Sequence, residues 1–143
     1  MKNEFYSIVA IAAFSTLATS ALSAERAFMC EYKTGVDVWT PEASLFVFDE
    51  EKQTAQAYDY FIKTMHGNPI KVDMSRPSQK RIQFNWKLKG VPTKFSDGDT
   101  LKVDLSYRAT LNSSTKQATL RVVPNVDVLN GTKATGTCRP VKP

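Results

Sequence analysis

The sequence predicts an all-β protein, an antiparallel sheet of about eight strands that forms an up-and-down barrel or a strongly bent sandwich. Three observations lead to this prediction. Apolar and polar residues alternate along several segments, turn-forming residues separate those segments, and one cysteine lies near each end of the chain that follows an apolar leader. The sequence contains no long helical stripe and no internal repeat.

The alternation is clearest over residues 80–89 and 101–111. In the first segment Ile82, Phe84, Trp86 and Leu88 point to one face, and the residues between them are polar or charged. Gly90, Pro92 and the SDGD segment at 96–99 have the composition of a turn. A third alternating segment at 118–122 ends at a proline, so residues 80–123 are expected to form a three-stranded meander.

The remaining strands are shorter. Residues 44–48 and 54–62 flank the charged turn DEEKQ at 49–53, which predicts a hairpin. A short strand at 70–74 follows the HGNP turn at 66–69, and strands at 27–33 and 132–138 complete the set of eight. Residues 36–41 and 126–129 receive no assignment, although the second stretch has room for one helical turn.

The domain organisation is simple. Residues 1–24 have a lysine at position 2, an apolar stretch over 5–17 and small residues before Ala24, which is typical of a secretory signal peptide. Residues 25–143 then form a single β domain, with no apolar stretch long enough to cross a membrane. The expected location is the periplasm or the extracellular space.

Export changes the meaning of the two cysteines. In an oxidising compartment Cys30 and Cys138 are expected to form a disulfide, whereas catalytic redox pairs have much closer spacing. The bond would close a loop of roughly 100 residues, a contribution on the order of 4 to 5 kcal/mol in the chain-entropy model. It would also place the first and last strands side by side, which closes the sheet and removes its edges.

The sequence offers little catalytic chemistry. Its single histidine, His66, lies in the HGNP turn, so a nucleophile paired with a histidine base is not expected, and neither a metal nor another cofactor is predicted. Carboxylates suitable for glycoside hydrolysis are interpreted as solvated surface acids: Asp49, Asp59, Asp73 and Asp104. Asp97 and Asp99 lack the spacing of a calcium loop. We expect no enzyme.

The formal net charge is +5, from 19 lysine and arginine residues against 14 aspartate and glutamate residues. Six of the basic residues occupy outward positions of three strands predicted to be neighbours, and they form the predicted binding surface: Arg81, Lys87, Lys89, Lys102, Arg108 and Arg121. Such a face suits an anionic glycan, a lipid headgroup or an acidic protein. Ordinary solubility charge is the alternative, because Asp104 interrupts the face. Nucleic acid is not expected, since the aromatic side chains point to the opposite face.

Aromatic residues are numerous in the inward positions. An eight-stranded barrel has an interior that either packs solid or holds one small ligand, so these residues form either the core or the lining of a site for a small amphiphile.

Six features occur in a characteristic order: an early Cys30, FVFD at 46–49, GNPI at 67–70, IQFNW at 82–86, YRATL at 107–111 and a closing GTC at 136–138. With the leader, they resemble small uncharacterised secreted proteins of Gram-negative, especially alphaproteobacterial, bacteria. The architecture is also similar to the small barrels of bacterial lysozyme inhibitors. The resemblance implies no activity or catalytic residue. The inhibitory loop motif of those inhibitors is not found, and a positive charge does not suit cationic lysozymes.

The sequence therefore predicts a non-enzymatic periplasmic or secreted binding protein, for a small amphiphile in the barrel or an anionic envelope component on the basic face. The alternative is a protein-interaction module, either an enzyme inhibitor or an accessory subunit of an envelope complex.

Overall fold

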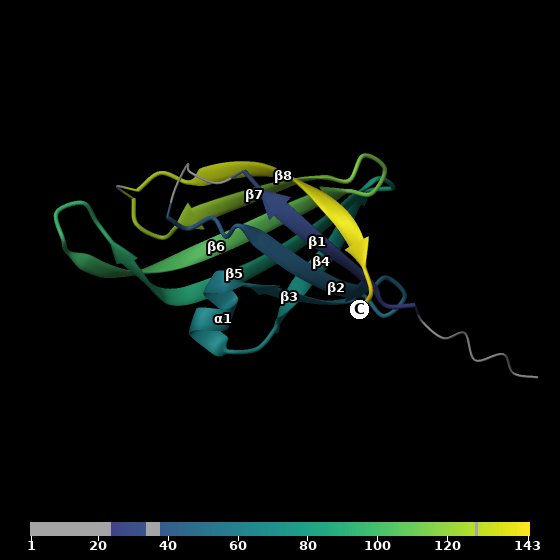
Figure 1. The fold of residues 1–143 in the computed structure, drawn as a ribbon, viewed down its shortest axis with the longest axis horizontal. Helices are drawn as coiled ribbons and strands as arrows, with labels where there is room; N and C mark the ends of the chain where they lie inside the picture. Colours follow the sequence, from purple (N-terminus) through teal and green to yellow (C-terminus); the bar gives the residue numbers. More distant parts are fainter. Residues whose placement is uncertain (1–23, 34–37, 128) are drawn as a thin grey trace, which may run out of the picture.

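The computed structural model describes residues 24–33, 38–127 and 129–143, so all of the predicted signal peptide except Ala24 lies outside the described residues. Eight strands and one short helix form a closed antiparallel barrel (Figure 1). The elements are β1 (Arg26–Tyr32), β2 (Ala43–Asp49), β3 (Thr54–Asp59), α1 (Tyr60–His66), β4 (Ile70–Ser78), β5 (Arg81–Lys94), β6 (Thr100–Asn112), β7 (Gln117–Pro124) and β8 (Thr132–Val141).

Each strand pairs with the next one along the chain, and β8 pairs with β1. The predicted fold class is therefore confirmed in its barrel form. At the seam Cys30 lies directly opposite Cys138, and the two sulfur atoms form a disulfide of 2.00 Å. The predicted pairing and the adjacency of the terminal strands are both confirmed. A disulfide within the chain is compatible with an oxidising periplasmic or extracellular location.

The barrel interior is filled with aromatic and aliphatic side chains. Residues predicted to point inward, including Phe84 and Trp86, are almost completely buried. Phe46 stacks on Phe84 with ring centroids 4.5 Å apart, and Trp86 stacks on Tyr107 at 5.1 Å. These aromatic residues contact one another and build the core, which is what their alternation in the strands requires.

Two predicted boundaries are wrong. The strand expected over 54–62 ends at Asp59, and residues 60–66 form α1, so His66 is the last helical residue rather than a turn residue. The Asp59 side chain caps the helix by accepting a hydrogen bond of 2.9 Å from the backbone N–H of Ile62, and Gly67 ends it in a left-handed conformation. Continuous apolar character at 60–62 obscured these two capping signals.

The other boundary concerns β5, which continues through Gly90 and Pro92 instead of turning there. Its register with β6 shifts between Leu88 and Val91, and Gly90 adopts a φ of +67° within this irregularity. The actual turn follows at residues 95–99, where Asp97 accepts a hydrogen bond from the backbone N–H of Asp99. The β5–β6 hairpin consequently extends past the rest of the barrel (Figure 1).

The β1–β8 seam requires a residue without a side chain at Gly136. A Cβ atom at this position would lie 2.1 Å from the carbonyl oxygen of Glu31, a backbone atom of the paired strand. We expect Gly136→Ala to lower the free energy of unfolding by about 1–3 kcal/mol, because the two strands would have to move apart. Urea denaturation measures this loss. The neighbouring Thr135→Ala is the control, and a Gly136→Ala variant as stable as that control would contradict the prediction.

Candidate functional site

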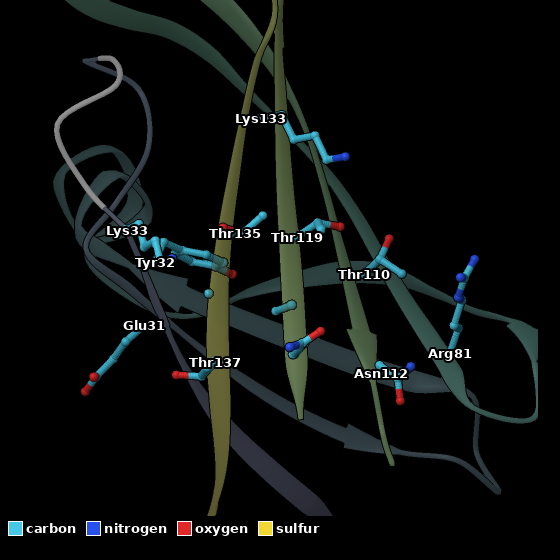
Figure 2. Close-up of a pocket in the computed structure, with 13 residues that line it drawn as sticks. Glu31, Tyr32, Lys33, Arg81, Thr110, Asn112, Thr119, Lys133, Thr135 and Thr137 are labelled. Atoms are coloured by element: carbon cyan, nitrogen blue, oxygen red, sulfur yellow. The ribbon is translucent and has the colours of Figure 1, made fainter. Parts of the chain in front are cut away.

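The outer face of strands β4 to β8 carries polar side chains in straight rows across the strands. Because antiparallel neighbours pair residue by residue, outward positions on successive strands line up. The register pairs Arg108 with Arg121 and Arg121 with Lys133, and we call these three residues the cation row. It likewise pairs Thr110 with Thr119 and Thr119 with Thr135, the threonine row. Figure 2 shows the threonine row and Lys133 on neighbouring strands.

The cation row places three positive charges on adjacent strands, and none of them forms an ion pair with an acid of the described residues. Among the described residues the ion pairs are those of Glu50 with Arg26 and Arg76, away from this row. Like charges directly opposite one another destabilise a sheet. Groups of residues that lower the stability of the fold are expected mainly at functional sites. The cation row is therefore a candidate binding site, because the fold itself does not need these three charges side by side.

The side chain of Arg108 is held by its neighbour on β5. Asn85 Oδ1 accepts a hydrogen bond of 3.2 Å from Arg108 Nε, and the register sets the two residues opposite each other. In the part of the chain that the structure describes, the two Nη groups of Arg108 have no partner. The arrangement orients the outer edge of the guanidinium, the edge that binds carboxylates and other oxyanions with two parallel hydrogen bonds.

Two depressions on this face are each lined by members of the cation row. One, of about 830 Å³, is lined by the threonine row and by Lys133, Arg81 and Lys33 (Figure 2). The other, of about 380 Å³, is lined by Arg108, Arg121 and Lys87. Each contains three basic residues and a single acid, Glu31 in the first and Asp73 in the second. Both depressions therefore have an excess of positive charge that favours an anionic ligand.

The structure brings most of the predicted basic residues together. Arg81 lines the larger depression, and Lys87, Arg108 and Arg121 line the smaller one. Lys89 and Lys102 are exposed on β5 and β6, but neither belongs to the lining of these depressions. Asp104 is exposed on β6, and its carboxylate accepts a hydrogen bond of 2.8 Å from the backbone N–H of Gly90.

Sequence reasoning missed Lys133, Asn85 and the threonine row. Lys133 lies on β8, the strand that returns to the start of the barrel, and its closeness to Arg121 follows from the β7–β8 register. The signal was nevertheless present, because Lys133, Thr135 and Thr137 alternate with Ala134, Gly136 and Cys138 in the predicted strand. Small residues in the inward positions made this alternation weak.

Two of the four acids considered for catalysis are buried, and these two lie far from each other. Asp73 and Asp104 are exposed as predicted, but the prediction is wrong for Asp49 and Asp59, which are buried. Asp49 accepts hydrogen bonds from two backbone N–H groups of its turn, and Asp59 caps α1. The register places these two acids at opposite ends of the β2–β3 hairpin, about 17 Å apart, beyond the separation that glycosidases use.

Metal ligands do not cluster in the described residues, where no group of three or more histidine, cysteine, aspartate or glutamate side chains suits an ion. His66 is exposed at the end of α1.

A second polar cluster lies inside the barrel beside α1. Tyr32, Ser44 and Asp59 occupy inward positions of β1, β2 and β3 and are all buried. Burial raises the pKa of the Asp59 carboxyl to about 6, against the opposing effect of hydrogen bonds from the backbone N–H groups of Ile62 and Phe61. Burial also raises the pKa of the Tyr32 hydroxyl, and the nearby charge of Asp59 adds to that rise. The cluster thus contains a carboxyl that changes charge at mildly acidic pH.

Comparison with known proteins returns no match to a protein-family model, a curated protein or a solved structure. No helix of the described residues has the length and apolar character needed to span a membrane.

Proposed function

We propose that the chain is a non-enzymatic periplasmic or secreted binding protein whose outer basic face holds an anionic component of the cell envelope. The observation that supports this most directly is the cation row: Arg108, Arg121 and Lys133 lie in register on three neighbouring strands with no acid paired to them among the described residues. An anionic ligand would relieve their mutual repulsion.

Two further observations favour the outer face over the barrel interior. Stacked aromatic rings occupy the interior, so a small amphiphile would have to displace packed core side chains. The outer face, in contrast, has two depressions in which basic side chains and polar groups are already positioned. A preformed site spares a ligand the cost of ordering these groups on binding.

The triple substitution of Arg108, Arg121 and Lys133 by glutamine tests this function. We expect it to weaken binding to immobilised polygalacturonate, polyphosphate or phosphatidylglycerol vesicles by about tenfold or more, since three exposed charge pairs contribute up to about 1 kcal/mol each. The salt dependence of binding should become shallower as well. Biolayer interferometry at several ionic strengths measures both quantities.

A matched control changes the same net charge elsewhere. Lys52, Lys63 and Lys71 are exposed on the β2–β3 turn, α1 and β4, outside the linings of both depressions. Their replacement by glutamine should leave binding within about threefold of the unmodified protein. Equal losses in the two triple variants would show that binding follows net charge alone, and the proposed site would be rejected.

A further inference from the structure

We infer that the anionic ligand is an acidic polysaccharide chain that crosses strands β6 to β8, with its acid groups on the cation row and its hydroxyl groups on the threonine row. This inference depends on the proposed function and names the class of ligand for the same face. It comes from the position of the threonine row, which has no part in the charge argument.

The two rows run side by side. They are separated by two residues along each strand, about 7 Å, and neighbouring members of a row are about 4.8 Å apart because that is the spacing between strands. Arg108 and Thr110 represent the two rows on β6, Arg121 and Thr119 on β7, and Lys133 and Thr135 on β8. The face therefore repeats a pair of one cation and one hydroxyl three times at equal intervals. A linear polymer with a charged and a hydroxylated edge has the matching repeat.

The threonine hydroxyls are available to such a ligand. Thr110 and Thr119 are half-buried, Thr135 is exposed, and no hydrogen bond engages their hydroxyl groups within the described residues. Each hydroxyl both donates and accepts, as sugar hydroxyls do. Gln83 lies opposite Thr110 on β5, at the end of the row, where its side-chain amide donates a long hydrogen bond of 3.5 Å to Asn85 Oδ1 and leaves its own oxygen as an acceptor. A ligand that presents only negative charge can accept hydrogen bonds from these groups, but it cannot donate to their oxygens, whereas a sugar hydroxyl can do both.

The position of the rows explains why a polymer fits better than a single small anion. The cation row is divided between the two depressions, with Lys133 lining the larger one and Arg108 and Arg121 lining the smaller one. The pairing of Arg121 with Lys133 joins them. A chain that occupies both depressions contacts the whole row, whereas an isolated anion reaches part of it.

A flat membrane surface is a poorer partner for the same face. The threonine side chains are short and lie between the longer Arg81 and Lys133 side chains in the larger depression (Figure 2). Headgroups in a bilayer would contact the long basic side chains first. Binding to vesicles would therefore depend on the cation row, and the threonine row would not contribute to it.

The test compares four probes: polygalacturonate with carboxylates, dextran sulfate with sulfates, polyphosphate without sugars, and phosphatidylglycerol vesicles. We expect the unmodified protein to bind at least one of the two glycans more tightly than polyphosphate and the vesicles. Replacing Thr110, Thr119 and Thr135 by valine should weaken binding to that glycan roughly tenfold, from the loss of three hydrogen bonds. Polyphosphate binding should fall by a clearly smaller factor, because polyphosphate has no sugar hydroxyls that donate to the threonine oxygens. Valine suits β-strands, so the fold should persist, and circular dichroism verifies it.

Replacement of the same three residues by serine is the matched control, because it keeps the hydroxyls and removes the methyl groups. Glycan affinity restored by serine would support the inference. Equal or tighter binding of polyphosphate or vesicles, or an unchanged glycan preference in the valine variant, would overturn it while the anion-binding function remains. No binding of any of the four probes would overturn both the inference and the proposed function.

Discussion

The double substitution Cys30→Ala with Cys138→Ala is expected to lower the free energy of unfolding by on the order of 4 to 5 kcal/mol. The disulfide joins residues 108 positions apart, and a cross-link that closes a loop of this length removes much conformational freedom from the unfolded chain. Single domains have total stabilities of roughly 5–15 kcal/mol, so the loss is a large fraction of the whole. Alanine is chosen because both sites are buried and a serine hydroxyl there would need a partner.

Urea denaturation followed by tryptophan fluorescence measures the change. The double variant should unfold at a much lower urea concentration, and its midpoint should not respond to a reducing agent, whereas the unmodified protein should lose stability when reduced. Circular dichroism in the absence of urea verifies that the variant still forms a sheet. A variant within about 1 kcal/mol of the oxidised protein would mean that pairing of β1 with β8 holds the seam without the bond.

Much of the fold was predictable because period-two alternation specifies the face of every strand residue. The alternation at 82–88 correctly placed the apolar side chains inside and the basic ones outside, and the two cysteines correctly indicated which strands close the barrel. Once short connections make consecutive strands antiparallel neighbours, the clustering of Arg81, Lys87, Arg108 and Arg121 on one face follows from the sequence alone.

The remaining features of the site could not be predicted without the register, that is, without knowing which residues of neighbouring strands lie opposite each other. The alternation predicts that Lys133 lies on the outer face. Only the residue-by-residue pairing of the strands shows that Lys133 lies beside Arg121 and that three threonines form a row. Local signals were also in conflict: Tyr60, Phe61 and Ile62 have high strand propensity, yet Asp59 and Gly67 supply both ends of a helix. The residue type predicts that Asp59 is exposed, because most aspartates are, so its burial could not be predicted from the sequence.

The largest pH effect is expected from Asp59, through the variant Asp59→Asn. The folded-state pKa of Asp59 is about 6, above its ordinary value of 3.8. Between these two values the native protein holds a proton that the unfolded chain has lost, so the free energy of unfolding falls as the pH rises through this window and stays level above it. The difference amounts to about 3 kcal/mol, because each pKa unit corresponds to roughly 1.4 kcal/mol.

Asparagine keeps the helix cap, because its side-chain oxygen can accept the hydrogen bond from Ile62 that Asp59 accepts now. It removes the buried charge beside Tyr32. Chemical denaturation at intervals between pH 4 and 8 should therefore show a variant that is more stable than the unmodified protein at pH 7.5, by up to about 3 kcal/mol, and that has a flatter profile below pH 6. Asp73→Asn, at an exposed acid, is the control and should leave the profile unchanged. If the slope between pH 4 and 6 persists in Asp59→Asn, the titrating group lies elsewhere and Asp59 is not a buried anion at neutral pH.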